Sequence, residues 1–291
     1  FTEYAEAVNK EAPAAVKVEM FHGGTLGPNP IQQLKLLQDG VAQIAFIITS
    51  YTPGRFPELE VAELPFILPS SREGALAFNS MLDKNMAPST KELKILGIVN
   101  SGIGSIHSTK VVTKPEDVKG LRLRVAGGGV SDMVKQLGGA PVLLGGGEMA
   151  EALNRGTIDG VVVEPFTIYA WKMQDKAISN MMVPMGSPTM IIAMRADTHA
   201  GLAPAAKAAV DKFSGRWVSE KWARNLDDGN VESLAKLKTA PGHTVTEPNP
   251  ADMAKWKAAL KPISDAWLAK RPENPALLAS FEKEVAAIRG K

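Results

Sequence analysis

The hydrophobic pattern over residues 120–166 alternates short strand-like segments with short helix-like segments. Apolar residues and arginines alternate with period two over residues 121–125, which predicts a strand. Apolar runs predict two further strands over residues 141–144 and 158–163, the second of them buried. Helices are predicted over residues 131–137 and 148–155, because Gly138 and Gly156 follow them as stop signals. Strands that alternate with helices predict a parallel sheet whose carboxyl-end edge binds ligands.

The same patterns predict the elements of the rest of the chain. Strands are expected over residues 16–21, 41–48, 93–100 and 189–194. Helices are expected over residues 1–9, 31–38, 71–82, 169–178, 252–268 and 276–288. Residues 204–238 are predicted to form one helix, which at about 1.5 Å per residue would be roughly 50 Å long, enough to cross both lobes of a two-lobed fold.

The length of the chain and an internal sequence similarity predict an α/β fold with two lobes. A chain of 291 residues exceeds one typical core. A helix end, a glycine and a core strand occur around Gly40 and again around Gly156. We therefore expect a cleft between lobe I, residues 1–112 with 199–238, and lobe II, residues 113–198 with 239–291. The predicted hinge lies near Val112 and Thr113, with the long helix as a spine.

Composition and charge exclude several classes of function. A net charge of +2 with 22% charged residues gives no electrostatic footprint for nucleic acid. The chain has no apolar run of the roughly 20 residues that a membrane span needs, so it is not expected to be membrane-embedded. It has no cysteine, and its four histidines have no metal-ligand spacing. We expect no metal, no cofactor and, without a catalytic acid–base pair, no enzymatic activity.

Arg124 is the principal candidate for ligand binding, because it lies near the end of a predicted buried strand. A buried arginine needs an anion, and the planar guanidinium matches a carboxylate in a two-point contact. The alternative is a structural ion pair. For Arg122 we expect a structural or a surface charge. The other candidates for the cleft follow or begin predicted strands and loops: Thr49, Ser50, Tyr51, Gly104, His107, Val163, Glu164, Phe166, Ser187 and Thr189. Turn formation, burial in a core and helix packing are the alternatives for these residues.

An ordered set of motifs in this chain resembles the solute-binding proteins of tripartite ATP-independent periplasmic (TRAP) transporters, the DctP family. The motifs are GLRLRV at residues 120–125, LGGAPV at 137–142, Glu148, Ala152-Leu153 and GTIDG at 156–160. The resemblance implies a type II-like periplasmic-binding-protein fold whose cleft closes on an organic acid, with Arg124 bound to the carboxylate. It also implies a periplasmic location, and a small and a large membrane subunit as partners. The family's first strand, and a leader, are expected to lie before Phe1.

Two departures from the family pattern narrow the expected ligand. Dicarboxylate and sialic-acid binders of this family tend to carry Asn where this chain has Val163 followed by Glu164. Sialic-acid binders also carry a second arginine near Gly104. The resemblance therefore implies a monocarboxylate with an apolar or aromatic body, or a cationic solute if Glu164 points inward. A ligand-sensing periplasmic module and a carboxylate-processing α/β enzyme are the alternative functions.

Overall fold

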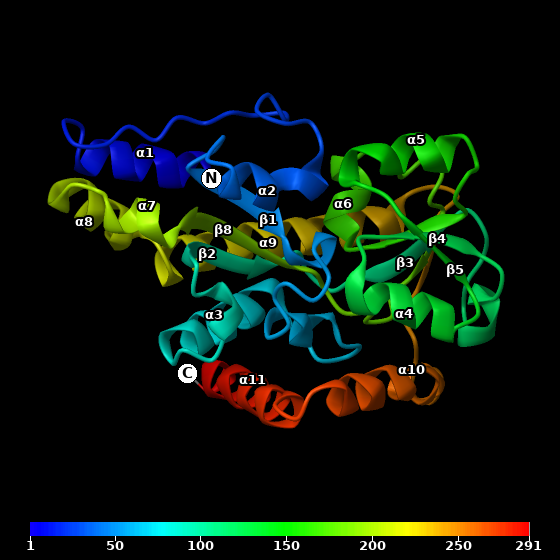
Figure 1. The fold of residues 1–291 in the computed structure, drawn as a ribbon. Helices are drawn as coiled ribbons and strands as arrows, with labels where there is room; N and C mark the ends of the chain where they lie inside the picture. The colour runs from blue at the N-terminus through cyan, green and yellow to red at the C-terminus, as the bar shows by residue number, and fades with distance from the viewer. Residues whose placement is uncertain (291) are drawn as a thin grey trace.

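A computed structural model describes residues 1–290 as a mixed α/β protein with two separate sheets (Figure 1). The three-stranded sheet has the order β1 (Ile44–Ile48), β8 (Thr189–Arg195), β2 (Leu93–Asn100). The six-stranded sheet has the order β5 (Ala140–Leu143), β4 (Arg122–Val125), β6 (Gly160–Val163), β3 (Ser105–Ser108), β7 (Ser179–Met181), β9 (Thr244–Thr246). The helices are α1 (Thr2–Glu11), α2 (Gln33–Gln38), α3 (Ser71–Asp83), α4 (Gly128–Gln136), α5 (Met149–Asn154), α6 (Pro165–Ala170), α7 (Ala196–Ala200), α8 (Pro204–Phe213), α9 (Arg216–Thr239), α10 (Pro250–Lys270) and α11 (Asn274–Arg289).

Each sheet has its own hydrophobic core, and the chain therefore forms two lobes. Ile47, Phe78 and Ile191 belong to the core around the three-stranded sheet, which we call the first lobe. The six-stranded sheet buries Leu123 on one face and Val161 on the other, and it forms the second lobe. Figure 1 shows the two sheets beside each other, with α9 running behind both. The predicted two-lobed α/β fold is confirmed.

The predicted strands of residues 120–166 all form, and they lie together in the second lobe. β4 pairs in parallel with both β5 and β6. Leu123 and Val125 of β4 fill the core beneath α4, while the alternating Arg122 and Arg124 point to the other face. β3 runs antiparallel to β6 and β7, so the predicted parallel arrangement describes only part of this sheet.

Two strands lie in the opposite lobe from the one that the sequence predicted. β3 pairs with β6 and β7 in the second lobe, and β8 lies between β1 and β2 in the first lobe. The chain therefore passes between the lobes at residues 101–104, the first crossover, and at residues 182–188, the second crossover. The predicted boundary and hinge at Val112 and Thr113 are wrong, because Val112 is fully buried in the core of the second lobe.

The predicted helix over residues 204–238 is two helices, α8 and α9. The break occurs at Gly215, whose φ of 64° is left-handed and whose N–H donates to the carbonyl of Leu96 in β2. Hydrogen bonding to the sheet thus replaces the helical bond at this point. α9 still spans both lobes, since Val218 packs in the first lobe and Leu237 in the second.

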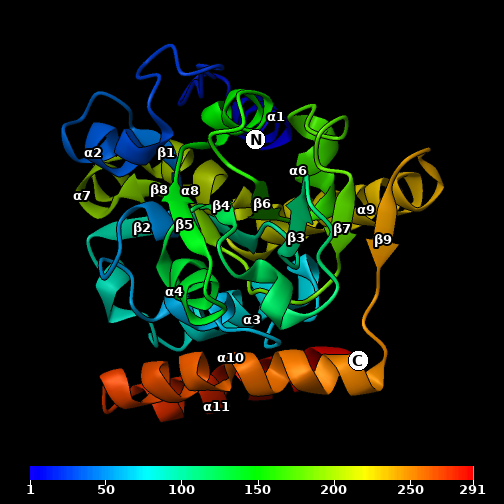
Figure 2. The same ribbon diagram turned by 90° about the vertical axis from the view of Figure 1, so that its right-hand side faces the viewer.

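The C-terminal helices cover both lobes rather than belonging to the second lobe alone. Figure 2 shows α10 and α11 along one side of the molecule. Trp256 and Leu260 of α10 are buried in the core of the second lobe, whereas Trp267 of α10 is buried in that of the first. Phe281 of α11 also packs in the first lobe. The predicted assignment of residues 239–291 to lobe II is therefore wrong for the last turns of α10 and for α11.

Two shorter predictions also differ from the structure. Residues 16–21 form no strand, because the side-chain amide of Asn9 takes both backbone hydrogen bonds of Val18. The helix predicted over residues 169–178 lies earlier, at α6, and the chain turns away at Lys172, whose φ is 55°. None of the helices formed by residues 1–290 is both long enough and apolar enough to cross a membrane.

Candidate functional site

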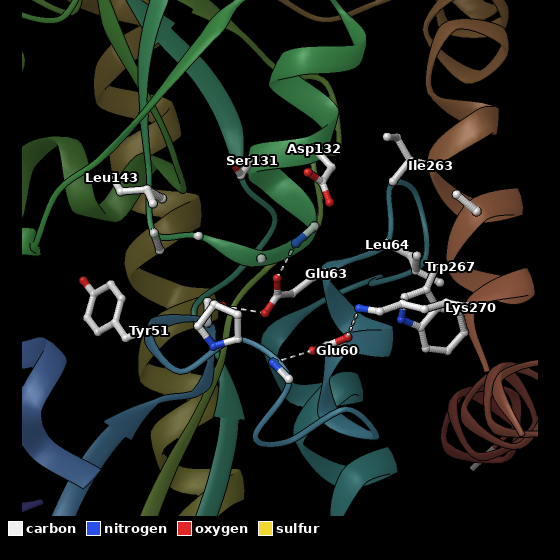
Figure 3. Close-up of a pocket in the computed structure, with 18 of the residues that line it drawn as sticks. Tyr51, Glu60, Glu63, Leu64, Ser131, Asp132, Leu143, Ile263, Trp267 and Lys270 are labelled. Carbon is white, nitrogen blue, oxygen red and sulfur yellow. Dashed lines mark hydrogen bonds and ion pairs between the residues drawn. The ribbon is translucent and has the colours of Figure 1, made fainter. Parts of the chain in front are cut away.

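A cavity of about 700 Å³ lies where the two lobes and α10 meet (Figure 3). The first lobe lines it with Ser50 and Tyr51, from the short 3₁₀ helix Thr49–Tyr51, and with Glu63, from the 3₁₀ helix Leu59–Glu63. The second lobe contributes Leu143 and Leu144, together with the glycine loop, which is Gly127, Gly128 and Gly129. Trp267 and Lys270 of α10 close one side. The cavity therefore opens between the lobes, where the sequence predicted a cleft.

Arg124 extends from β4 toward this cavity and is only 4% exposed. Its Nε and Nη2 donate to the carbonyl of Leu144 over 3.0 and 2.8 Å, and Nη2 also donates to the hydroxyl of Tyr51 over 3.2 Å. Leu144 and Tyr51 both line the cavity. Within residues 1–290, no carboxylate oxygen lies within 4.0 Å of this guanidinium.

The electrostatics of Arg124 indicate a charge that lacks its partner. Burial lowers the pKa of the guanidinium, while Tyr51 and the more distant carboxylates of Glu164 and Glu148 oppose that shift. An arginine is nevertheless always charged in proteins. Because a buried charge without a counter-ion is costly, an anion placed beside this guanidinium would lower the free energy of the site.

Arg122 lies on the same strand as Arg124 but, unlike it, pairs with a carboxylate. Its Nε donates to Asp159 over 2.9 Å and its Nη2 donates to the carbonyl of Gly156 over 2.8 Å. Hydrogen bonding to Arg122 holds the pKa of the Asp159 carboxyl well below its usual range. The prediction that Arg122 has a structural role is confirmed.

The three predicted residues after β1 divide between two roles. Tyr51 reaches Arg124, and the Ser50 hydroxyl donates to the carboxylate of Glu63. The Thr49 hydroxyl instead donates to the carbonyl of Thr189 over 2.9 Å. The Thr189 hydroxyl in turn donates to the carbonyl of Leu59 over 3.0 Å. Thr49 and Thr189 therefore hold the two 3₁₀ helices against β8 rather than facing the cavity.

Glu164 directly follows β6, and its carboxylate interacts with the charge of Arg124. It is buried, and its carboxylate accepts a hydrogen bond from the Thr167 hydroxyl. Burial raises the pKa of Glu164, whereas hydrogen bonds from Thr167 and Ser101 and the charge of Arg124 lower it. Val163, the residue before it, is buried in the core of the second lobe.

Gly104 and Ser187 lie in the two crossovers between the lobes. The Gly104 N–H donates to the carbonyl of Gly186 over 3.0 Å, and the Met185 N–H donates to the carbonyl of Gly104 over 2.9 Å. The Ser187 N–H donates to the carbonyl of Ala62 over 3.0 Å. The crossovers thus run side by side and are bonded to each other and to the first lobe.

His107 lies inside the six-stranded sheet, in β3. Its Nδ1 is 2.7 Å from Oδ1 of Asn180 in β7, and its side chain is fully buried. Burial lowers the pKa of His107 to about 4, so the imidazole is neutral at physiological pH. The structure therefore gives His107 a role in the packing of the second lobe.

Phe166 packs on α9 at the start of α6. Its N–H donates to Oδ1 of Asn230 over 3.0 Å, and Nδ2 of Asn230 donates to the carbonyl of Ser101 in the first crossover. A Cβ at Gly229 would lie 2.7 Å from Cδ2 of the Phe166 ring. Gly229 thus leaves room for the ring, and α9 is tied to the second lobe at this turn.

We expect Gly229→Ala to destabilise the protein by about 1–2 kcal/mol, because the added methyl group overpacks the contact with Phe166. In an open helix the same change would stabilise by about 1 kcal/mol through helix propensity. Urea unfolding of Gly229→Ala, of Phe166→Ala and of the double variant measures the effect of Gly229→Ala on the free energy of unfolding with and without the Phe166 ring. Stabilisation by Gly229→Ala in the presence of Phe166 would contradict the contact.

The sequence did not identify Glu63 or α10 as parts of this site. Glu63 precedes the apolar run of residues 64–68, and that run reads as an unstructured connection. The one sequence signal for Glu63 is that an acidic residue stands directly beside this apolar run. No local pattern assigns Trp267 or Lys270 to the cleft, because their position depends on how α10 crosses the molecule.

Comparison with known proteins gives a consistent family. The model of DctP, described as bacterial extracellular solute-binding protein, family 7, matches residues 1–271. The C4-dicarboxylate-binding periplasmic protein DctP of Rhodobacter capsulatus is 23% identical over 268 residues, which are 90% of this chain and 80% of that protein. A solute-binding protein of Albidiferax ferrireducens is 24% identical over 177 residues, which are 60% of this chain and about half, 52%, of that protein.

Two solved structures share the fold of nearly the whole chain. A marine metagenome TRAP solute-binding protein specific for aromatic acid ligands has a TM-score of 0.91 at 24% identity, covering 98% of this chain and 92% of its own. A TRAP periplasmic solute-binding protein of Bordetella bronchiseptica with bound mandelate has a TM-score of 0.89 at 24% identity, covering 99% and 93%. The family predicted from the motifs is confirmed: this chain belongs to family 7 of the bacterial extracellular solute-binding proteins, the DctP family.

Proposed function

We propose that this protein is the periplasmic receptor of a TRAP transporter, and that it captures a small monocarboxylate with an aromatic or apolar body. The observation that carries the proposal is the buried guanidinium of Arg124, which has neutral partners at the edge of the interlobe cavity. The receptor delivers the acid unchanged to the small and large membrane subunits, so it performs no chemical step. Closure of the two lobes around the acid removes water and strengthens the ion pair.

The charges around Arg124 favour one carboxylate over two. The guanidinium offers one positive charge, and the carboxylates of Glu164 and Glu148 act on it as its acidic neighbours. A second carboxylate on the ligand would add negative charge near Glu164 and Glu148, which would raise the cost of binding a dianion. Glu164 instead suits a ligand hydroxyl, which can donate a hydrogen bond to it.

The walls of the cavity favour an apolar body. Leu64, Leu143 and Leu144 line it, together with Ile31 and Ile263. Pockets of this kind hold a ligand mainly by apolar contact, and a few polar groups set its orientation. The two solved structures with aromatic acid specificity or bound mandelate support the same class of ligand.

A thermal-shift screen of the unfolded and refolded protein tests this proposal, since refolding removes any acid that was carried through purification. The panel contains benzoate, mandelate, an aliphatic monocarboxylate, succinate, glucuronate and an amino acid. We expect an aromatic monocarboxylate to give the largest shift, because a ligand at a hundred times its Kd adds about 2.7 kcal/mol of stability. A largest thermal shift with succinate would contradict the monocarboxylate assignment. The absence of a shift with every acid of the panel would overturn the receptor proposal.

A further inference from the structure

The carboxyl group of Glu63 is bonded across the boundary between the lobes. Glu63 ends the 3₁₀ helix Leu59–Glu63 of the first lobe and is only 2% exposed. Its Oε1 accepts a hydrogen bond from the Ser50 hydroxyl, and its Oε2 accepts the N–H of Gly129 over 2.9 Å. Gly129 lies in the first turn of α4, in the second lobe. Figure 3 shows this carboxyl near the middle of the residues that line the cavity, with a dashed line to each of its two partners.

The second lobe and the second crossover enclose Glu63 closely. Gly128 has a φ of 55°, and a Cβ built there would lie 1.8 Å from Oε2 of Glu63. Gly186 has a φ of 76°, and its Cβ would lie 2.3 Å from the backbone oxygen of Glu63. A Cβ at Gly127 would likewise lie 2.6 Å from the carbonyl oxygen of Ser50. Separation of the lobes would remove the glycine loop from Glu63 and expose its carboxyl to water.

The groups around Glu63 favour its neutral form. Burial raises the pKa of the carboxyl, the hydrogen bonds from Ser50 and Gly129 oppose this, and the negative charges of Glu60 and Asp132 add to the rise, so that the pKa is about 7. Lys270 of α10 lies 3.9 Å from Glu60, and Lys135 of α4 lies 3.3 Å from Asp132. Tyr51 is bonded to Arg124, and residues 182–188 contain no ionisable side chain. In the part of the chain that the structure describes, Glu63 itself has no cation within 4.0 Å.

We propose that Glu63 is a proton-linked latch: its neutral carboxyl holds the glycine loop and keeps the cleft closed, and its ionisation favours opening. Glu63 would thereby set the pH range in which the receptor retains its solute. The proposal rests on the proposed function only in that the closed cleft is the solute-holding state. Glu63 acts on the solute through closure, so it is a positioning residue rather than a ligand contact.

The sign of the pH effect follows from the two environments. In the closed form the carboxyl has a pKa of about 7, whereas the ordinary pKa of an exposed glutamate is 4.5. A raised pKa means that protonation favours the closed form, and this advantage is lost as the pH rises from the lower value through the higher one. The ratio of closed to open protein is therefore expected to fall about thirtyfold between about pH 5.5 and about pH 8.5.

Fluorescence energy transfer across the cleft of the unliganded protein tests the latch. The chain has no cysteine, so Lys35→Cys in α2 and Glu151→Cys in α5 give two unique labelling sites on different lobes. Both side chains are exposed, at 69% and 64%, and α2 and α5 lie on the same side of the molecule in Figure 1. We expect the labels to move apart as the pH rises from about 5.5 to about 8.5.

Glu63→Gln is the decisive variant, because its amide cannot ionise. Its oxygen can still accept the Gly129 N–H, and its NH2 group can donate to the Ser50 hydroxyl in place of the bond that Ser50 donates to Glu63. We expect it to remain closed at both pH values. Asp132→Asn is the matched control, since it removes a neighbouring carboxylate from α4 and should keep the pH response with a slightly lower midpoint. The latch is overturned by a wild-type distance that does not depend on pH, by Glu63→Gln responding as the wild type does, or by Glu63→Gln staying open. No ligand is present, so failure of the acid screen would leave this result unaffected.

Discussion

Replacement of Arg124 by glutamine is expected to weaken binding of the carboxylate ligand by at least about thirtyfold. Truncating one partner of a buried, hydrogen-bonded charge pair typically costs about 2–5 kcal/mol, and Arg124 is 4% exposed. The stability of the unliganded protein should change little, because the guanidinium has no carboxylate within 4.0 Å among the described residues. Calorimetric titration measures the first effect and thermal unfolding without ligand measures the second.

Two further variants separate the position of Arg124 from its charge. Arg122→Gln removes an arginine from the same strand but not from the cleft, since Arg122 pairs with Asp159 at the start of β4. It should leave the affinity unchanged. Arg124→Lys keeps the charge without the planar two-point contact, so its affinity should fall between those of the wild type and Arg124→Gln. Equal affinities for Arg124→Gln and the wild type would remove the basis of the proposed function.

Gly186→Ala is expected to destabilise the protein by about 3 kcal/mol. A left-handed conformation costs an L-residue about 1–2 kcal/mol, and Gly186 has a φ of 76°. The added Cβ would also lie 2.3 Å from the backbone oxygen of Glu63, which cannot move without shifting the crossover. Chemical denaturation measures the loss.

Gly156→Ala provides the control for this prediction. Gly156 has a φ of 67°, but a Cβ there would meet nothing within 4 Å. It should therefore cost only the conformational part, about 1–2 kcal/mol. Equal losses at the two positions would show that the close approach of Gly186 to Glu63 does not matter.

The sequence predicted those parts of the fold that depend on local patterns. β4 formed where the alternation placed it, and β5 and β6 formed at the apolar runs, which follow the glycines that end α4 and α5. Arg124 could be recognised for the same reason, since an arginine near the end of a buried strand is an unusual feature in itself.

Contacts between distant segments were beyond the reach of local patterns. β8 inserts between β1 and β2, although about half the chain separates it from β1. His107 looked like a cleft residue because its partner, Asn180, lies 73 residues away. Glu63 was missed because its burial depends on a glycine loop from the other lobe. The sequence could therefore propose the anion site but not the residues that close it.

Calorimetric titration of the refolded wild-type protein with matched pairs of an acid and its primary amide tests the central claim most directly. Benzoate with benzamide and mandelate with mandelamide have nearly the same shape and differ in charge. If Arg124 holds a carboxylate, we expect an acid to bind and its amide to bind at least about thirtyfold more weakly. An amide that binds as tightly as its acid would show that the buried guanidinium does not recognise the anion.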